Sequence, residues 1–490
     1  MNSPSTALAP RLWNQWLLPS TLAATAATLL LLGQIINPAF LTATLLTMCA
    51  ATAGYFRPFT GFLCYLFSIQ VIDYVKRLLL VFGNPSQVEW YGILLLPDVI
   101  LLAVVLGTVV ASENSKILHL PKYRAVALAL GLYALWYTVR TLWTDAPLLN
   151  AVGKWKLVVP YFICFYLGER LITNLAALRS VLKLLAITVG LAALYGVWQL
   201  FFGLTGFEER WLYGGYTSLT LGTMLYGDGL TRVFSFYSDP ATFCQLLACV
   251  VPLLMFSRRL FNAHWWNSWL LIGIMCSGMI ATVIRSGWLL ASLGAGMWWL
   301  QSDVRRSRRI VILIAALASL AGVAWWTVSS VAAVDNQLLA RAVVTGTYSD
   351  RAKGYQNLLD KGIGGFILGR GTASLSTSVR DISGSGFASG TNLDSPDDVI
   401  AHDYVTETLY ELGWIGLALI IFSIARTLVG TPPAFLGRFS PGLQFLVLGV
   451  PLVAALFGGS AMEVRPVITL VWTGAGVLCS RGPYSLSTQS

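Results

Sequence analysis

The stretch YGILLLPDVILLAVVLGTVVA, residues 91–111, is apolar almost throughout and contains one charged residue, Asp98. A helix of roughly 20 apolar residues spans the hydrocarbon core of a bilayer, so this stretch is long enough to cross a membrane. Similar apolar runs recur from Leu17 to Leu478. The chain of 490 residues is 56% hydrophobic and 11% charged, with a mean hydropathy of +0.70, whereas soluble domains carry roughly 25% charged residues. The sequence therefore predicts a polytopic membrane protein and excludes a water-soluble or disordered chain.

The apolar runs predict an all-α fold with about twelve to fourteen transmembrane helices. Two of the runs, 157–170 and 466–480, are short for a full crossing, so each is expected to be tilted, re-entrant or buried against its neighbours. The expected spans are residues 17–36, 39–55, 61–82, 91–111, 125–144, 157–170, 181–203, 241–257, 267–284, 286–302, 310–330, 403–426, 441–457 and 466–480.

Basic residues in the short loops predict the orientation of these helices. Four arginines lie between residues 305 and 309, with only Asp303 beside them, so this loop is expected to face the cytoplasm. Alternation outward from this loop puts both termini in the cytoplasm. The expected organisation is N-terminal helices over 1–203, an extracytoplasmic loop over 204–240, central helices over 241–330, a large extracytoplasmic loop with short helices over 331–402, and C-terminal helices over 403–490.

More arginines fall on the expected outer face than the orientation rule requires. Arg285 is the most informative, because it lies in a tight turn between two spans, IRSG at 284–287, with no acidic residue close in sequence. A guanidinium stays charged and can bind phosphate through two parallel hydrogen bonds. Arginines gathered at this boundary are therefore suited to a diphosphate whose lipid tail lies in the bilayer. The alternative is that they form weak surface ion pairs with loop acids such as Glu208 and Asp350.

Two further polar residues lie where helices meet the expected outer surface. His402 lies in IAHDY at 400–404, where the large loop re-enters the membrane. A histidine there could act as a general base near neutral pH, or it could cap or pack against the helix that follows. Arg140 lies near a helix end between Trp136 and Trp143, which favours a side chain that extends its charge to the membrane surface.

Several of these stretches resemble the O-antigen ligase and O-antigen polymerase superfamily. The clearest is AHDY at 401–404 followed by YELGWIG at 410–416, which is similar to a helix that opens with His and continues into E-L-G-x-x-G. Ten residues separate His402 from Gly413, and this spacing is similar to the His-x10-Gly pattern of the polymerases.

Four more stretches extend the resemblance over roughly residues 210–425. Ten residues also separate Arg351 from Gly362, which is similar to the Arg-x10-Gly pattern of the polymerases. The other three are the glycine-rich run GIGGFILGRG at 362–371, RVFSF at 232–236 followed by Asp239-Pro240, and TVIRSG at 282–287.

The resemblance implies glycosyl transfer outside the bacterial cytoplasmic membrane by an enzyme of GT-C-like architecture, without a cofactor, metal or nucleotide sugar. The donor would be a glycan on a polyprenyl diphosphate in the membrane lipid. The acceptor would be a sugar hydroxyl of another lipid-linked repeat for a polymerase, or of a lipid A core for a ligase. Arg232, Arg285, Arg351 and Arg370 would bind the diphosphate, and His402 would take the proton of the acceptor hydroxyl. Partners could include a flippase and a chain-length regulator, and no nucleic acid is implied.

Other functions remain open at this point. A transporter of an anionic solute or lipid-linked sugar would use the same arginines as a vestibule, but it predicts cations around a midplane cavity rather than at one face. A scaffold would use the 331–402 loop for docking and would tolerate loss of Arg285 and His402 together. Between polymerase and ligase, the two ten-residue spacings favour the polymerase.

Overall fold

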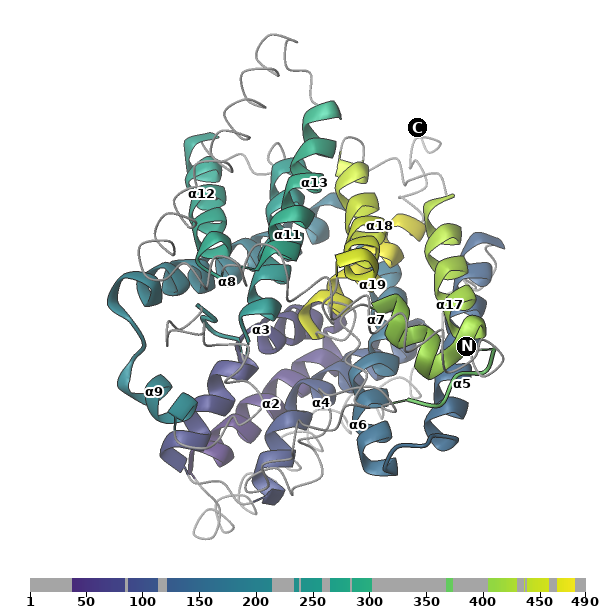
Figure 1. The fold of residues 1–490 in the computed structure, drawn as a ribbon, viewed down its shortest axis with the longest axis horizontal. Helices are drawn as coiled ribbons and strands as arrows, with labels where there is room; N and C mark the ends of the chain where they lie inside the picture. Colours follow the sequence, from purple (N-terminus) through teal and green to yellow (C-terminus); the bar gives the residue numbers. More distant parts are fainter. Residues whose placement is uncertain are drawn as a thin grey trace, which may run out of the picture. The chain divides into compact units, whose positions relative to one another are not determined.

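The structure is a computed structural model, and the described residues are 38–83, 87–112, 121–213, 233–237, 239–257, 265–282, 284–301, 367–372, 404–429, 436, 439–457 and 465–480. Within these ranges the regular elements are helical (Figure 1). The predicted spans 17–36 and 310–330 lie outside them.

The chain divides into two compact units, Met1–Ala111 and Ser112–Ser490. The first unit contains α2 (Pro38–Phe56), α3 (Pro58–Gly83) and almost all of α4 (Gln87–Ser112). The second unit contains α5 (Pro121–Leu142), α6 (Leu148–Val158), the 3-10 turn η1 (Val159–Phe162), α7 (Ile163–Leu171), α8 (Leu175–Phe202), α9 (Gly206–Tyr213), α11 (Pro240–Ser257), α12 (Trp265–Ala281), α13 (Arg285–Gln301), α17 (Tyr404–Leu428), α18 (Ser440–Phe457) and α19 (Arg465–Cys479).

The length and composition of the helices identify a polytopic membrane protein, as the hydropathy predicts. Among the described residues, six helical segments are long and apolar enough to cross a bilayer: Gly92–Ala111, Arg124–Leu142, Leu148–Leu171, Leu175–Phe202, Pro240–Ser257 and Glu407–Leu428. The protein encloses 89% of the apolar stretch of α11 but only 33% of that of α5. Helix α11 is therefore central in the second unit, whereas much of α5 is left for lipid to cover.

Most predicted spans in the described ranges begin and end within a few residues of an observed helix. The largest differences are at the first residues of two spans. The predicted span 157–170 is only the second half of a helical run from Leu148 to Leu171, which η1 interrupts at Pro160. A proline cannot donate a backbone hydrogen bond, so a tighter turn forms at this point. The span predicted over 181–203 begins earlier, at Leu175 in α8.

The contact between α7 and α19 depends on glycines. A methyl group on Gly476 would run into the carbonyl oxygen of Phe165, and one on Gly168 would meet the backbone of Thr473. Small residues of this kind let helix backbones approach closely in membranes. The rings of Phe162 and Trp472 pack edge to face beside this contact, with centroids 5.3 Å apart.

We expect Gly476→Ala to destabilise the protein, because its Cβ would contact backbone that cannot move aside without shifting a helix. Overpacking of this kind costs about 1–3 kcal/mol. Gly131→Ala is the matched control, since nothing lies within 4 Å of its added methyl group. Thermal unfolding of both variants in the same detergent checks the expectation, which equal melting temperatures would contradict.

Candidate functional site

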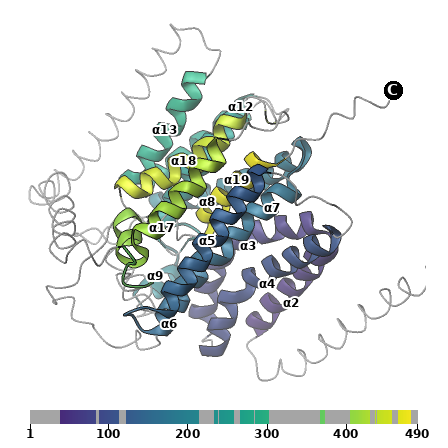
Figure 2. The ribbon, with the colours of Figure 1, turned by 90° about the vertical axis from the view of Figure 1, so that its right-hand side faces the viewer.

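Helix α17 is broken at Gly413, inside the E-L-G-x-x-G stretch. Gly413 has φ 71° and ψ −173°, a conformation that is essentially restricted to glycine. The break separates an N-terminal half-helix, Tyr404–Leu412, from the remainder of α17. The half-helix lies beside α5 in the second unit (Figure 2).

Donors from elsewhere in the chain bind the carbonyl groups just before the break. The backbone N–H groups of Arg370 and Gly371 donate to the carbonyl oxygens of Tyr410 and Glu411, at 2.8 and 2.9 Å. The indole of Trp136 on α5 donates to the carbonyl oxygen of Leu412 at 2.8 Å. Within a membrane, carbonyl groups released by a helix break need such internal donors. The three bonds therefore stabilise the break.

The donors from 370 and 371 belong to a short segment, Ile367–Thr372, which we call the linking segment. Gly369 has φ 74°, and a methyl group on it would collide with the carbonyl of Glu411. The approach of the linking segment to α17 therefore requires glycine at this position.

The opposite side of the linking segment is bonded to the end of α5. The guanidinium of Arg140 donates to the carbonyl oxygen of Gly369 at 2.6 Å, and the Thr372 amide donates to the carbonyl oxygen of Arg140 at 3.2 Å. The Thr144 hydroxyl donates to the carbonyl oxygen of Thr372 at 2.7 Å. The extension of Arg140 toward the membrane surface stays a prediction, and the structure adds that a carbonyl of the linking segment accepts its hydrogen bond.

The linking segment presents Arg370 with its backbone fixed and its side chain exposed. The backbone carbonyl of Arg370 accepts a hydrogen bond from the Asp145 amide at 3.2 Å, while its amide is bonded to α17. Its guanidinium lies over the ring of Tyr410, 5.3 Å from the centroid, in a cation–π contact. Because the backbone of this arginine is already fixed, only side-chain freedom would be lost when its guanidinium binds an anion.

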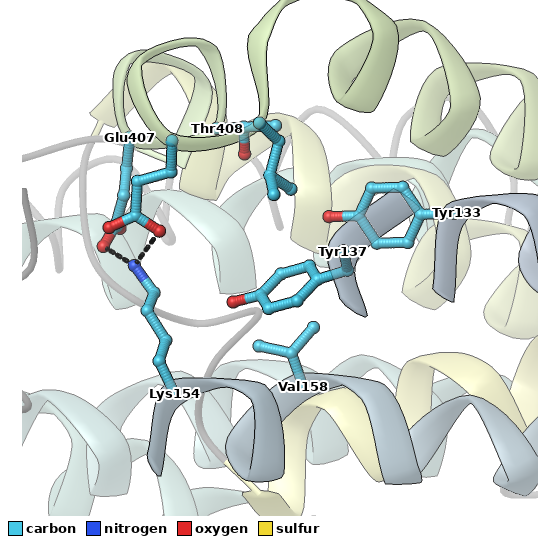
Figure 3. A pocket seen from close by; sticks show the side chains of 8 residues that line it. Tyr133, Tyr137, Lys154, Val158, Glu407 and Thr408 are labelled. Carbon is cyan, nitrogen blue, oxygen red and sulfur yellow. Dashed lines mark hydrogen bonds and ion pairs between the residues drawn. The ribbon is translucent and has the colours of Figure 1, made fainter. Parts of the chain in front are cut away.

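A buried ion cluster joins the N-terminal half-helix to α6. The ammonium group of Lys154 contacts the carboxylates of both Glu407 and Glu411, the second at 2.7 Å (Figure 3). The side chains of Lys154 and Glu411 are 1% and 2% exposed. Tyr133 and Tyr137 of α5 line the same small pocket, which has room for roughly one water molecule.

The structure describes only part of the arginine and histidine set expected from the sequence. Arg285 is the first residue of α13, and Arg370 lies on the linking segment. Arg232, Arg351 and His402 lie outside the described residues.

The start of α13, where Arg285 lies, is packed against the start of α11. The thiol of Cys244 on α11 donates to the carbonyl oxygen of Ile284 at 3.5 Å. A methyl group on Gly287 would collide with the sulfur of Cys244. The TVIRSG stretch and the helix that begins at Pro240 therefore meet directly.

The turn Val233–Tyr237, which follows Arg232 in the sequence, is fixed by buried hydrogen bonds. Ser235 has a left-handed φ of 53°, and its amide donates to the side-chain oxygen of Gln199 on α8 at 2.8 Å. The amide nitrogen of the Gln199 side chain in turn donates to Glu208 on α9 at 2.8 Å. The backbone strain at Ser235 is held in place by this network.

The Lys154–Glu407–Glu411 cluster was not predicted from the sequence. A signal was available, because Glu407 and Glu411 are four residues apart in an apolar helix and so share one face. Ionisable residues inside membrane segments usually pair with one another and mark functional regions. The partner on α6 lies more than two hundred residues away in the chain, so the pairing needed the tertiary structure.

The two junctions differ in the groups that are available to bind a ligand. The junction at the α17 break combines an exposed guanidinium with a rigid backbone, and the α11–α13 junction begins a helix with an arginine. No protein-family model matches this chain, and no curated protein matches it.

Proposed function

We propose that the protein is a membrane glycosyltransferase of the O-antigen ligase and polymerase type. It transfers an oligo- or polysaccharide from a polyprenyl-diphosphate carrier to a sugar hydroxyl on the outer face of the bacterial cytoplasmic membrane, with both termini in the cytoplasm. One observation carries this proposal. The glycine-rich run ending at Gly371 and the ELG stretch around Gly413, which are far apart in the sequence, are hydrogen-bonded into one junction that presents Arg370. These are two of the stretches on which the family resemblance depends.

The proposed reaction needs an anion site and a base. The acceptor oxygen forms a bond to the anomeric carbon while the bond from that carbon to the phosphate oxygen breaks, and the electron pair leaves with the polyprenyl diphosphate. Arg232, Arg285, Arg351 and Arg370 would stabilise the charge that builds on this leaving group. His402 would accept the proton of the attacking hydroxyl. Direct attack of this kind inverts the anomeric centre.

Polymerisation of repeat units is the favoured version of this activity, with a flippase that supplies the donor and a regulator of chain length as partners. Deleting the gene and resolving the surface polysaccharide on a gel tests the proposal. Loss of the ladder above a single repeat unit identifies a polymerase, and full-length polymer left on its lipid carrier identifies a ligase. An unchanged ladder contradicts the proposal for surface glycans and favours transport of an anionic solute or lipid-linked sugar.

We expect Arg370→Ala to weaken the binding of the donor, because its guanidinium would lose hydrogen bonds to a charged phosphate. A bond of this kind contributes about 1.5–3 kcal/mol, so the KM for the donor should rise by about 10- to 100-fold. Initial rates at varied donor concentration check this. The control is Arg210→Ala, which removes another exposed arginine, from α9. An equal KM in the two variants would remove Arg370 from the proposed site.

A further inference from the structure

The N-terminal half-helix of α17 is not held in place by the remainder of that helix. The positive φ of Gly413 interrupts the helix, and the carbonyls of residues 410–412 accept hydrogen bonds from the linking segment and from Trp136. The position of the half-helix must therefore be set by its contacts with other elements.

Charged side chains supply the contact on the α6 side. Glu407 and Glu411 lie one helical turn apart, and the carboxylates of both form ion pairs with the ammonium group of Lys154. Coulomb attraction is strong in an environment that excludes water. Without Lys154, the carboxylates of Glu407 and Glu411 would lose the cation with which both form ion pairs. Loss of one partner from a buried ion pair is far more damaging than loss of a surface pair.

The second contact is made by the linking segment, which connects the half-helix to the chain between α5 and α6. Helix α6 follows α5 after a short connection, and residues of this connection, Thr144 and Asp145, bond to the linking segment. The linking segment binds α17 at the break, and α17 binds α6 through Lys154. The half-helix is therefore held at two points relative to Arg370.

We infer that Lys154 is a positioning residue, which acts through Glu407 and Glu411 to fix the N-terminal half-helix. The inference rests on the proposed function, because the half-helix begins two residues after His402, the proposed base. Loss of Lys154 would release the first turn of the half-helix, which follows the base, while the hydrogen bonds to residues 410–412 still hold the end that contacts Arg370. The rate of the chemical step should therefore depend on Lys154 more than donor binding does.

The test uses full-length protein in lipid nanodiscs, with lipid-linked repeat units extracted from the deletion strain as donor and acceptor. We expect Lys154→Met to lower kcat by about 100-fold, the effect of a small misplacement of a reacting group. The KM for the donor should change by less than about threefold, since binding and chemistry are separable. Lys154→Arg should recover most of the activity, because a guanidinium can bond both carboxylates.

A matched control and a second measurement distinguish the loss of positioning from a general destabilisation of the protein. Lys156→Met removes a lysine from the same helix, outside the pocket, and should leave kcat unchanged. Glu407→Gln keeps the buried Lys154–Glu411 pair, so it should fold and lose only about tenfold in kcat, in line with the loss of one charged hydrogen bond. Hydrogen exchange should rise at least about tenfold over residues 404–412 in Lys154→Met, but not over 414–428, because opening is local.

Two results would contradict the role of Lys154. If Lys154→Met matches Lys156→Met in kcat, or if exchange over 404–412 does not change, Lys154 does not position the half-helix. If the wild-type protein transfers no glycan, the proposed function fails, while the exchange measurement still shows whether Lys154 holds the half-helix.

Discussion

Replacing His402 with alanine is expected to lower the rate of glycan transfer by about 10²- to 10⁴-fold, the range that a positioned general base contributes. An acceptor hydroxyl is a weak nucleophile until its proton is removed, and alanine cannot accept a proton. The arginines that bind the diphosphate would be untouched, so the KM for the donor should stay close to that of the wild type. The loss would therefore be a loss of kcat.

Single-turnover transfer with a purified lipid-linked donor would measure this directly, because it isolates the chemical step from product release. The chain contains two other histidines, His119 and His264, which the sequence analysis puts in cytoplasmic loops, so their alanine variants are matched controls. Near-normal transfer by His402→Ala would remove the proposed base even if the family assignment were right.

The sequence predicted the helices well because the bilayer imposes a simple requirement. A segment such as Pro240–Ser257 can cross the hydrocarbon core of a bilayer only if it is predominantly apolar, so its hydropathy locates it within a residue or two. The prediction was less accurate where charged residues enter an apolar run. Lys154 and Lys156 lower the hydropathy of α6, so the predicted span began at 157 although the helix begins at Leu148.

The candidate site was harder to predict, because hydrogen bonds between distant segments build it. The sequence showed a glycine at 413, but not that the carbonyls before it would accept bonds from Arg370, Gly371 and Trp136. Hydropathy cannot identify a donor on another segment, whether the donor lies 40 residues away, as Arg370 does from Tyr410, or 276 residues away, as Trp136 does from Leu412. The same reason explains Arg140, because its place at a helix end did not predict that the carbonyl oxygen of Gly369 would accept its hydrogen bond.

These contacts explain why glycine, rather than any small residue, occupies two positions at the junction. Gly369 and Gly413 both have a positive φ, and a methyl group on Gly369 would come within 2.6 Å of the Gly413 nitrogen. The two backbones therefore meet without intervening side chains. Close backbone contact, together with the side-chain hydrogen bonds of Trp136, Arg140 and Thr144, therefore brings an exposed arginine beside the broken helix.

We therefore expect Gly413→Ala, like His402→Ala, to have a large effect on the rate of glycan transfer. Alanine is strained at φ 71° and ψ −173°, at a cost on the order of 1–3 kcal/mol. The chain can avoid this cost by continuing the helix through residue 413. The carbonyls of Tyr410 and Glu411 would then accept bonds from within α17, and the amides of Arg370 and Gly371 would lose their acceptors. We expect kcat to fall by about 100-fold, because Arg370 and the half-helix would both be displaced.

Limited digestion with trypsin can detect the released linking segment, since the bond after Arg370 should be cleaved much faster once the Gly371 amide is free of Glu411. The control is Gly296→Ala on α13, where nothing lies within 4 Å of the added methyl group; it should cleave and transfer at wild-type rates. If Gly413→Ala resists trypsin at Arg370 as the wild type does and keeps its transfer rate, the break is not required for function. Slow transfer without faster cleavage would mean that the strain is absorbed elsewhere in α17, and that the linking segment keeps its hold on the helix.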